Sequence, residues 1–252
     1  MNNSFLLSCI KANEEIYQKL KDGYEESYYD MSSVGAGGDV SSGLDLWAES
    51  IFVKHLGSFG KIESEESGSI GEGTHTIIID PIDGSSNALS HFPYFGTSVA
   101  KIGADGILDS AVVCNLANGD IFLKELQKPL LQGRLFDTTY NEPIVTPNAH
   151  IGLFEKAYAH PNIVSRLDEL NLKFRAPGAV ALSLAYARTV NYLLFVGSYR
   201  IYDFAAGLAL CEDLTVIVEE DYVIVSKDKD IASKIDSLVR ESLYMNSNVK
   251  DN

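Results

Sequence analysis

Cysteine is scarce in this sequence, and its spacing excludes a framework of disulfide bonds. The 252 residues contain three cysteines, Cys9, Cys114 and Cys211, which is an odd number, and they form no CxxC pair. Small secreted proteins that depend on disulfides carry cysteines in even numbers at characteristic spacings. We therefore expect three reduced thiols in the core of a cytoplasmic protein.

Positive charge is also in short supply. The chain has 20 Lys and Arg residues against 35 Asp and Glu residues, so its formal net charge is −15. Such a charge repels phosphate backbones, which argues against a general nucleic-acid binder. Intrinsic disorder is excluded by a hydrophobic fraction of 46% and by 11 Phe and 13 Tyr residues, because a chain of this composition can bury a full core.

The sequence lacks the long apolar segment that a membrane span or an export signal needs. The short run Leu6-Leu7-Ser8-Cys9 is similar to a lipoprotein cleavage site, but no basic residue precedes it and Lys11 ends the apolar stretch. A signal peptide needs both a positively charged start and an apolar region of about 7–15 residues. We expect a cytoplasmic protein that has no membrane partner.

Helical and strand periods alternate along the chain without a linker rich in Gly, Ser or Pro. This alternation predicts a single α/β body over residues 1–252, with an N-terminal part of 1–140 and a C-terminal part of 141–252. Apolar spacing predicts helices at 2–20, 44–56, 179–187, 204–211 and 231–243 and strands at 76–79, 99–102, 111–113, 121–123, 192–196, 216–218 and 222–225. The region 22–43 is expected to form a flexible loop or a loose hairpin.

One stretch of the sequence contains acids but no bases. Residues 62–100 include six Asp and Glu residues and neither Lys nor Arg. A solvated acidic loop would explain the segment 63–72 by itself. The imbalance also fits a site that takes its positive charge from an external cation.

The sequence Asp80-Pro81-Ile82-Asp83-Gly84-Ser85 closes this stretch directly behind a predicted buried strand. Ligands of α/β proteins commonly bind at the carboxyl ends of strands. The proline fixes a bend that lets Asp80 and Asp83 project to the same side, and the free N–H groups of a helix that starts at Ser85 would receive a phosphate. Two carboxylates beside an anion site indicate Mg²⁺ between them, although the same hexapeptide can also be a purely structural turn.

Four sequence elements, in order, resemble the signatures of the inositol monophosphatase and fructose-1,6-bisphosphatase superfamily. The pattern between and around these elements fits the family from about residue 5 to 225. The elements are Asp39-x5-Asp45-x3-Glu49, Ser64-Glu65-Glu66-Ser67, Asp80-Pro81-Ile82-Asp83-Gly84-Ser85 and Tyr202-Asp203-Phe204-Ala205-Ala206-Gly207. The resemblance implies a layered αβαβα fold, hydrolysis of phosphomonoesters with two or three Mg²⁺ ions per site, inhibition by Li⁺, and a homodimer.

The resemblance also implies roles for individual residues. Glu65, Asp80 and the carbonyl of Ile82 would hold the first metal ion, and Asp80, Asp83 and Asp203 the second, while Glu65 would contribute to a third. Ser85 and Asp45 match the pair that orients and deprotonates the attacking water, and Glu65 is also expected to be catalytic. Contacts to the phosphate or to the rest of the substrate are expected from Asp83, Gly84, Ser85, Ser86, Gly178, Ala179 and Arg200.

Some of these residues also have ordinary structural interpretations. Asp203 could cap a helix that starts at Phe204, and Glu49 could form a salt bridge on a helix surface. Glu66 could be a solvated neighbour of the site. Trp47 is expected in the core, and the five histidines show no metal-binding spacing.

Departures from the family pattern leave the substrate open. Val196 stands where inositol phosphatases usually carry a glutamate, and no Lys or Arg lies between Lys21 and Lys54. The favoured substrate class is an inositol phosphate or a related sugar phosphate. The alternatives are fructose 1,6-bisphosphate, for which Arg200 is the best-placed base, and then a 3′-phosphonucleotide. A non-enzymatic alternative is an acidic metal-binding protein with a decayed site.

Overall fold

The computed structural model describes residues 3–247, and its contacts divide the chain into two compact units. The first unit comprises the chain up to Pro143 together with Ala179–Ala185 and Arg200–Leu210. The second comprises Ile144–Gly178, Tyr186–Tyr199 and the chain from Cys211 on. A single body spanning 1–252 stays a prediction.

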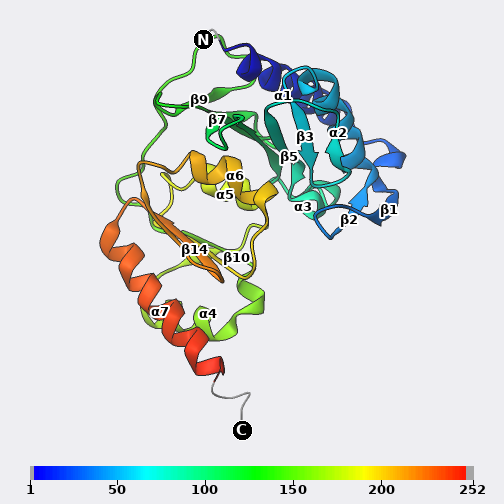
Figure 1. The fold of residues 1–252 in the computed structure, drawn as a ribbon. Helices are drawn as coiled ribbons and strands as arrows, with labels where there is room; N and C mark the ends of the chain where they lie inside the picture. The colour runs from blue at the N-terminus through cyan, green and yellow to red at the C-terminus, as the bar shows by residue number, and fades with distance from the viewer. Residues whose placement is uncertain (1–2, 248–252) are drawn as a thin grey trace. The chain divides into compact units, whose positions relative to one another are not determined.

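The first unit is built on a seven-stranded, mainly antiparallel sheet (Figure 1). The strand order is β4-β3-β5-β6-β7-β8-β9, and β3 and β5 are the parallel pair. The strands of this sheet are β3 (Lys61–Ser64), β4 (Gly68–Ile70), β5 (Thr76–Asp83), β6 (Gly96–Ile102), β7 (Leu108–Asn115), β8 (Asp120–Glu125) and β9 (Leu131–Arg134). The helices of the unit are α1 (Ser4–Asp22), α2 (Gly43–Leu56), α3 (Ser85–Leu89), α5 (Val180–Ala185) and α6 (Ile201–Ala209), with the 3₁₀ turn η1 (Glu26–Tyr29) and a hairpin of β1 (Met31–Val34) and β2 (Val40–Ser42).

Helices cover both faces of this sheet, as alternate residues of β6 show. Val99 is fully buried in the cluster that α1 and α2 form with the sheet. Its neighbour Ser98 points to the opposite face, where its hydroxyl donates to the carbonyl of Tyr202 in α6 at 3.1 Å. The layered α/β arrangement predicted for this part of the chain is therefore present.

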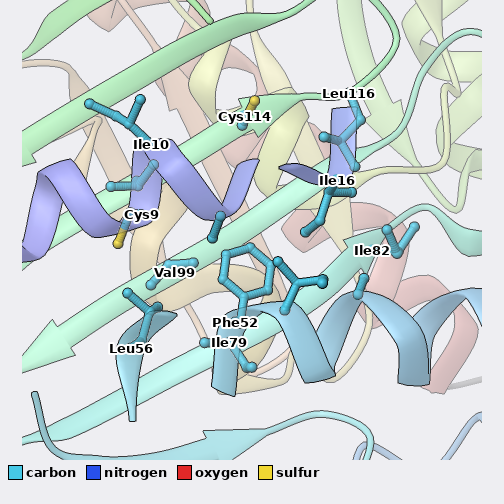
Figure 2. Close-up of a cluster of buried hydrophobic side chains, with 14 of the residues drawn as sticks. Cys9, Ile10, Ile16, Phe52, Leu56, Ile79, Ile82, Val99, Cys114 and Leu116 are labelled. Carbon is cyan, nitrogen blue, oxygen red and sulfur yellow. The ribbon is translucent and has the colours of Figure 1, made fainter. Parts of the chain in front are cut away.

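The core between α1, α2 and the sheet fixes the strand that leads to the candidate site. Figure 2 shows Phe52 and Leu56 of α2 beside Ile79 and Ile82 of β5. A register shift between Asp80 and Asp83 allows Ile82 to return to this apolar layer. Two buried isoleucines thus anchor β5 on either side of Asp80.

All three cysteines are free and buried, as the sequence predicts. Cys9 and Cys114 belong to the cluster in Figure 2, where burial raises the pKa of both thiols. Thiols in such surroundings are poor nucleophiles, so they contribute to packing.

The second unit contains a five-stranded mixed sheet with the order β11-β10-β12-β14-β13. Its strands are β10 (Gly152–Glu155), β11 (Phe174–Arg175), β12 (Leu193–Val196), β13 (Thr215–Val218) and β14 (Tyr222–Ser226). Its helices are α4 (Pro161–Glu169) and α7 (Lys229–Ser247), with the 3₁₀ turn η2 (Ala157–Ala159). Leu167 of α4 and Ile235 of α7 share one buried cluster with Leu194 of β12.

Of the two alternatives expected for residues 22–43, a flexible loop or a loose hairpin, the structure shows the β1–β2 hairpin, preceded by η1. Within residues 3–247, no helix combines the length and the apolarity that a membrane crossing requires.

Candidate active site

Three carboxylates meet at the end of β5. One side-chain oxygen each from Glu65, Asp80 and Asp203 lies within 4.8 Å of the other two. The parallel pairing of β3 and β5 sets Ser64 opposite Ile79, and the N–H of Glu65 donates to the carbonyl of Ile79 at 3.1 Å. Asp203 comes from α6, which covers the face of the sheet toward which Ser98 points. The topology thus brings together three acids that are up to 138 positions apart in the sequence.

This cluster is buried and carries more negative charge than its surroundings compensate. Only 3% of Asp80 is exposed, and burial, followed by the charge of Glu65, raises its pKa well above the ordinary value. Burial, followed by the charge of Asp203, raises the pKa of Glu65 to about 8 although Arg200 opposes the shift. Such a group of carboxylates is costly to keep ionised without a cation.

The donor set fits a hard divalent cation. All the ligand atoms that the cluster offers are carboxylate oxygens, which are the donors that Mg²⁺ and Ca²⁺ prefer. A bound cation would also offset the mutual repulsion that raises the pKa of Asp80. Glu65, Asp80 and Asp203 are therefore the residues that would hold such an ion.

Arg200, the residue before α6, reaches the same cluster. Its Nη1 lies 2.7 Å from Oε1 of Glu65 and 2.8 Å from Oδ2 of Asp39, and its Nε donates to Oδ2 of Asp203 at 3.1 Å. Nη1 also donates to the carbonyl of Gly37 at 3.0 Å. The expected substrate contact of Arg200 stays a prediction, because the contacts seen are to carboxylates and to the backbone.

Asp83 and Ile82 lie beside the cluster with partners of their own. One carboxylate oxygen of Asp83 accepts from the N–H of Leu182 at the start of α5, at 2.7 Å. The carbonyl of Ile82 lies 2.9 Å from the hydroxyl of Ser85. Asp83 does not belong to the group of oxygens within 4.8 Å, so its role as a metal ligand, like that of Ile82, stays a prediction.

The predicted pair of Ser85 and Asp45 is brought together. The hydroxyl of Ser85 donates to Oδ1 of Asp45 at 2.5 Å. The other carboxylate oxygen accepts from the N–H of Ser42 at 2.8 Å and from its hydroxyl at 2.7 Å, in a capping box that starts α2. The helix start thus holds Asp45 through Oδ2, while Oδ1 accepts from Ser85.

A second element, α3, starts at the predicted phosphate site. Gly84 precedes it with a φ of +89°, a left-handed conformation that favours glycine. The first N–H groups of a helix have no partner within it. The N–H groups of Gly84, Ser85 and Ser86 are therefore candidates for holding a phosphate.

The structural alternatives given above for Glu49, Glu66 and Asp203 do not describe their surroundings in the structure. Glu49 is buried and accepts from the N–H and the hydroxyl of Ser67, at 3.0 and 2.6 Å, so it anchors the turn that carries Glu65. Burial raises the pKa of Glu66 to about 7. Asp203 is not the cap of its helix, because α6 begins at Ile201 and places Asp203 in the first turn.

The predicted substrate contacts Gly178 and Ala179 fall on either side of the division between the two units. The N–H of Gly178 donates to the carboxylate of Glu155 at 2.9 Å, within the second unit. Glu155, a fully buried acid at the end of β10, was not singled out in the sequence because a lone glutamate in a short strand carries no motif. Val196 is buried at the end of the neighbouring strand β12.

Comparison with known proteins places the chain in a family. The model of the inositol monophosphatase family matches residues 5–219. A fructose-1,6-bisphosphatase/inositol-1-monophosphatase of Methanothermobacter thermautotrophicus is 28% identical, over 76% of this chain and 75% of the relative. Nus factor SuhB of Escherichia coli is 29% identical, over 84% of this chain and 83% of the relative.

Another relative is much longer than this chain. The bifunctional NADP phosphatase/NAD kinase of Methanococcus maripaludis is 26% identical over 84% of this chain, which spans only 42% of that protein. Among solved structures, the extragenic suppressor protein SuhB of Bartonella henselae superimposes with a TM-score of 0.76 at 22% identity, over 94% of this chain and 98% of that one. This likeness confirms the predicted layered α/β fold. The chain belongs to the inositol monophosphatase family, and its enzyme class is that of the phosphoric monoester hydrolases.

Proposed function

We propose that this protein hydrolyses a phosphomonoester of a sugar or polyol in a Mg²⁺-dependent reaction. The observation that carries the proposal is the juxtaposition at the end of β5. Three buried carboxylates suited to a divalent cation lie next to Ser85, whose hydroxyl is bonded to Asp45, at the start of α3.

In this proposal the residues of the chain divide the work between binding and proton transfer. Magnesium, held by Glu65, Asp80 and Asp203, would supply the positive charge that stabilises the phosphoryl oxygens and the leaving group. The N–H groups of Gly84 and Ser85 hold and orient the phosphate. The hydroxyl oxygen of Ser85 orients the attacking water and accepts a proton from it, while the hydroxyl's own proton passes to Oδ1 of Asp45, to which it is already bonded at 2.5 Å.

The substrate class is chosen from the residues and from the relatives. Inositol phosphate or a related sugar phosphate is favoured, although the glutamate missing at Val196 removes one usual contact to the inositol ring. Fructose 1,6-bisphosphate is the second candidate, supported by the relative that carries both activities in its name. The test also includes release of phosphate from NADP, because a longer relative carries that activity in its name.

The experiment is a substrate panel with the full chain. Phosphate release from inositol 1-phosphate, fructose 1,6-bisphosphate, a 3′-phosphonucleotide and NADP would be measured with saturating Mg²⁺ and again with a chelator. We expect hydrolysis of at least one sugar or polyol phosphate that the chelator abolishes and that Li⁺ inhibits. Turnover that persists in the chelator, or near wild-type turnover of Asp83→Asn at saturating Mg²⁺, would contradict the metal mechanism.

Arg200→Ala would separate the two sugar substrates. A loss confined to fructose 1,6-bisphosphate would support the bisphosphatase alternative, whereas equal losses on both substrates would count against it. The homodimer, the cytoplasmic location and the absence of a nucleic-acid partner belong to the same proposal. Sedimentation of the purified protein, with and without RNA, would test the homodimer and the absence of a nucleic-acid partner.

A further inference from the structure

The guanidinium of Arg200 occupies a position among acids that also form the proposed cation site. Two of the three clustered carboxylates, Glu65 and Asp203, are bonded to it at 2.7 and 3.1 Å. About a third of the Arg200 side chain is exposed, so its charge is partly shielded from solvent. Charge-assisted bonds of this kind are among the stronger ones in proteins.

A divalent cation and this guanidinium need the same two carboxylates, those of Glu65 and Asp203. A cation bound by Glu65 and Asp203 would stand beside the positive charge of Arg200, and the repulsion between them would be weakly screened at a buried site. Each therefore lowers the occupancy of the other at these two carboxylates.

Arg200 also fastens the glycine-rich loop 35–39 between β1 and β2. Its Nη1 bonds the carbonyl of Gly37 and the carboxylate of Asp39, at 3.0 and 2.8 Å. The loop has no base of its own, because neither Lys nor Arg lies between Lys21 and Lys54. Arg200 thus provides a positive charge that joins this loop to the carboxylate cluster.

The loop lies directly against the residue for which the two cations compete. The N–H of Gly37 donates to the carbonyl of Glu65 at 2.7 Å, and that of Ala36 to the carbonyl of Glu66 at 3.0 Å. A Cβ atom at position 37 would stand 2.5 Å from Cγ of Glu65. Only glycine permits this approach. A change in the position of the Glu65 side chain would therefore change the packing of the loop.

We infer that Arg200 is a positioning residue that competes with the divalent cation for Glu65 and Asp203, and that its release on cation binding loosens the loop 35–39. The inference rests on the proposed metal site. Cation loading would thereby be coupled to the opening of this edge of the site.

Calorimetric titration of Mg²⁺ into the full chain tests the competition. Arg200→Gln is expected to bind Mg²⁺ about tenfold more tightly than the wild type, because both carboxylates lose their competing partner. Arg200→Lys, which keeps the charge but loses the planar fork, should lie between the two. The matched control is Arg134→Gln, which removes one positive charge from the same unit, where Arg134 pairs with Asp120 and is 62% exposed. Its affinity should stay within about twofold of the wild type, because an exposed ion pair contributes little.

Hydrogen exchange at the amide of Gly37 tests the coupling to the loop. In the wild type, Mg²⁺ should speed this exchange, whereas in Arg200→Gln it should be fast with and without Mg²⁺. The wild-type measurement remains decisive even where the glutamine variant fails to fold. Unchanged or weaker Mg²⁺ binding by Arg200→Gln, or slower exchange at Gly37 on Mg²⁺ addition, would overturn the inference. Asp80→Asn separates the two proposals, since a wild type that binds no more Mg²⁺ than this variant would refute the metal site itself.

Discussion

Buried carboxylates occur in both units, but their surroundings differ. In the first unit Asp80 is crowded by other acids, which together with burial raise its pKa well above the ordinary value. In the second unit Glu155 is buried to the same degree, yet its carboxylate accepts the backbone N–H of Gly178 at 2.9 Å. Burial alone therefore does not distinguish the two acids. Crowding of several acids at one strand end is the feature that indicates a cation site.

The largest difference in kcat should appear between variants of the two buried acids, Asp80 and Glu155. Asp80→Asn should lower kcat by about 10³-fold or more, because loss of a ligand of the proposed cation would remove several kcal/mol of stabilisation from the transition state. Glu155→Gln should keep kcat within about tenfold while lowering the free energy of unfolding by about 1–3 kcal/mol, since it weakens a buried hydrogen bond. Steady-state phosphate release and denaturant unfolding of the two variants provide the measurements. A larger kcat loss in Glu155→Gln than in Asp80→Asn would reverse the comparison.

A smaller loss is expected at the water-directing pair. Ser85→Ala should lower kcat by about 10²-fold with little change in Mg²⁺ affinity, because it removes the hydroxyl that passes its proton to Asp45. Ser85→Thr is the matched control, since it keeps the hydroxyl and should stay within about fivefold of the wild type. Equal losses in both variants would assign Ser85 a packing role instead.

The sequence predicted the clustered acids of the first unit, but it did not single out Glu155 in the second. The resemblance of four sequence elements to a known family grouped Glu65, Asp80 and Asp203 in one predicted site, and the structure brings their carboxylates together. The β-branched run in β5 was likewise identified, although β6 begins at Gly96, three residues before its predicted start. Pairing with β5 and β7 extends that strand, and such pairing is not visible in local propensity.

Contacts between distant segments account for what the sequence could not predict. Arg200 meets Gly37 and Asp39 across 163 and 161 positions, and no period or spacing rule relates these residues. Arg200 also stands at the cap position of α6, where the sequence offered Asp203 as an alternative to its predicted role as a metal ligand. Cap preferences are weak compared with several charge-assisted bonds, so tertiary contacts decided where this helix begins.

The smallest expected effect is a change of stability with pH in the presence of a chelator. Its direction follows from the raised pKa values of the acids at the site. The folded pKa is about 8 for Glu65 and about 7 for Glu66, both raised above the ordinary value of 4.5 mainly by burial. Folding therefore favours the protonated forms, so stability from these groups is complete below about pH 4.5 and is lost as the pH rises through 7 to 8. The unfolding midpoint should fall by about 5 °C between pH 5 and pH 8.

Two variants show whether that loss arises at the cluster. Asp80→Asn should flatten the pH dependence and raise the midpoint at pH 8, because one of the crowded charges is gone. Glu155→Gln should leave the fall between pH 5 and pH 8 in place, because Glu65 and Glu66 are unchanged in that variant. Saturating Mg²⁺ should restore most of the loss in the wild type and none in Asp80→Asn. A wild-type midpoint that rises with pH in the chelator would contradict this account, because it would show that groups of the chain already balance the charges at the end of β5.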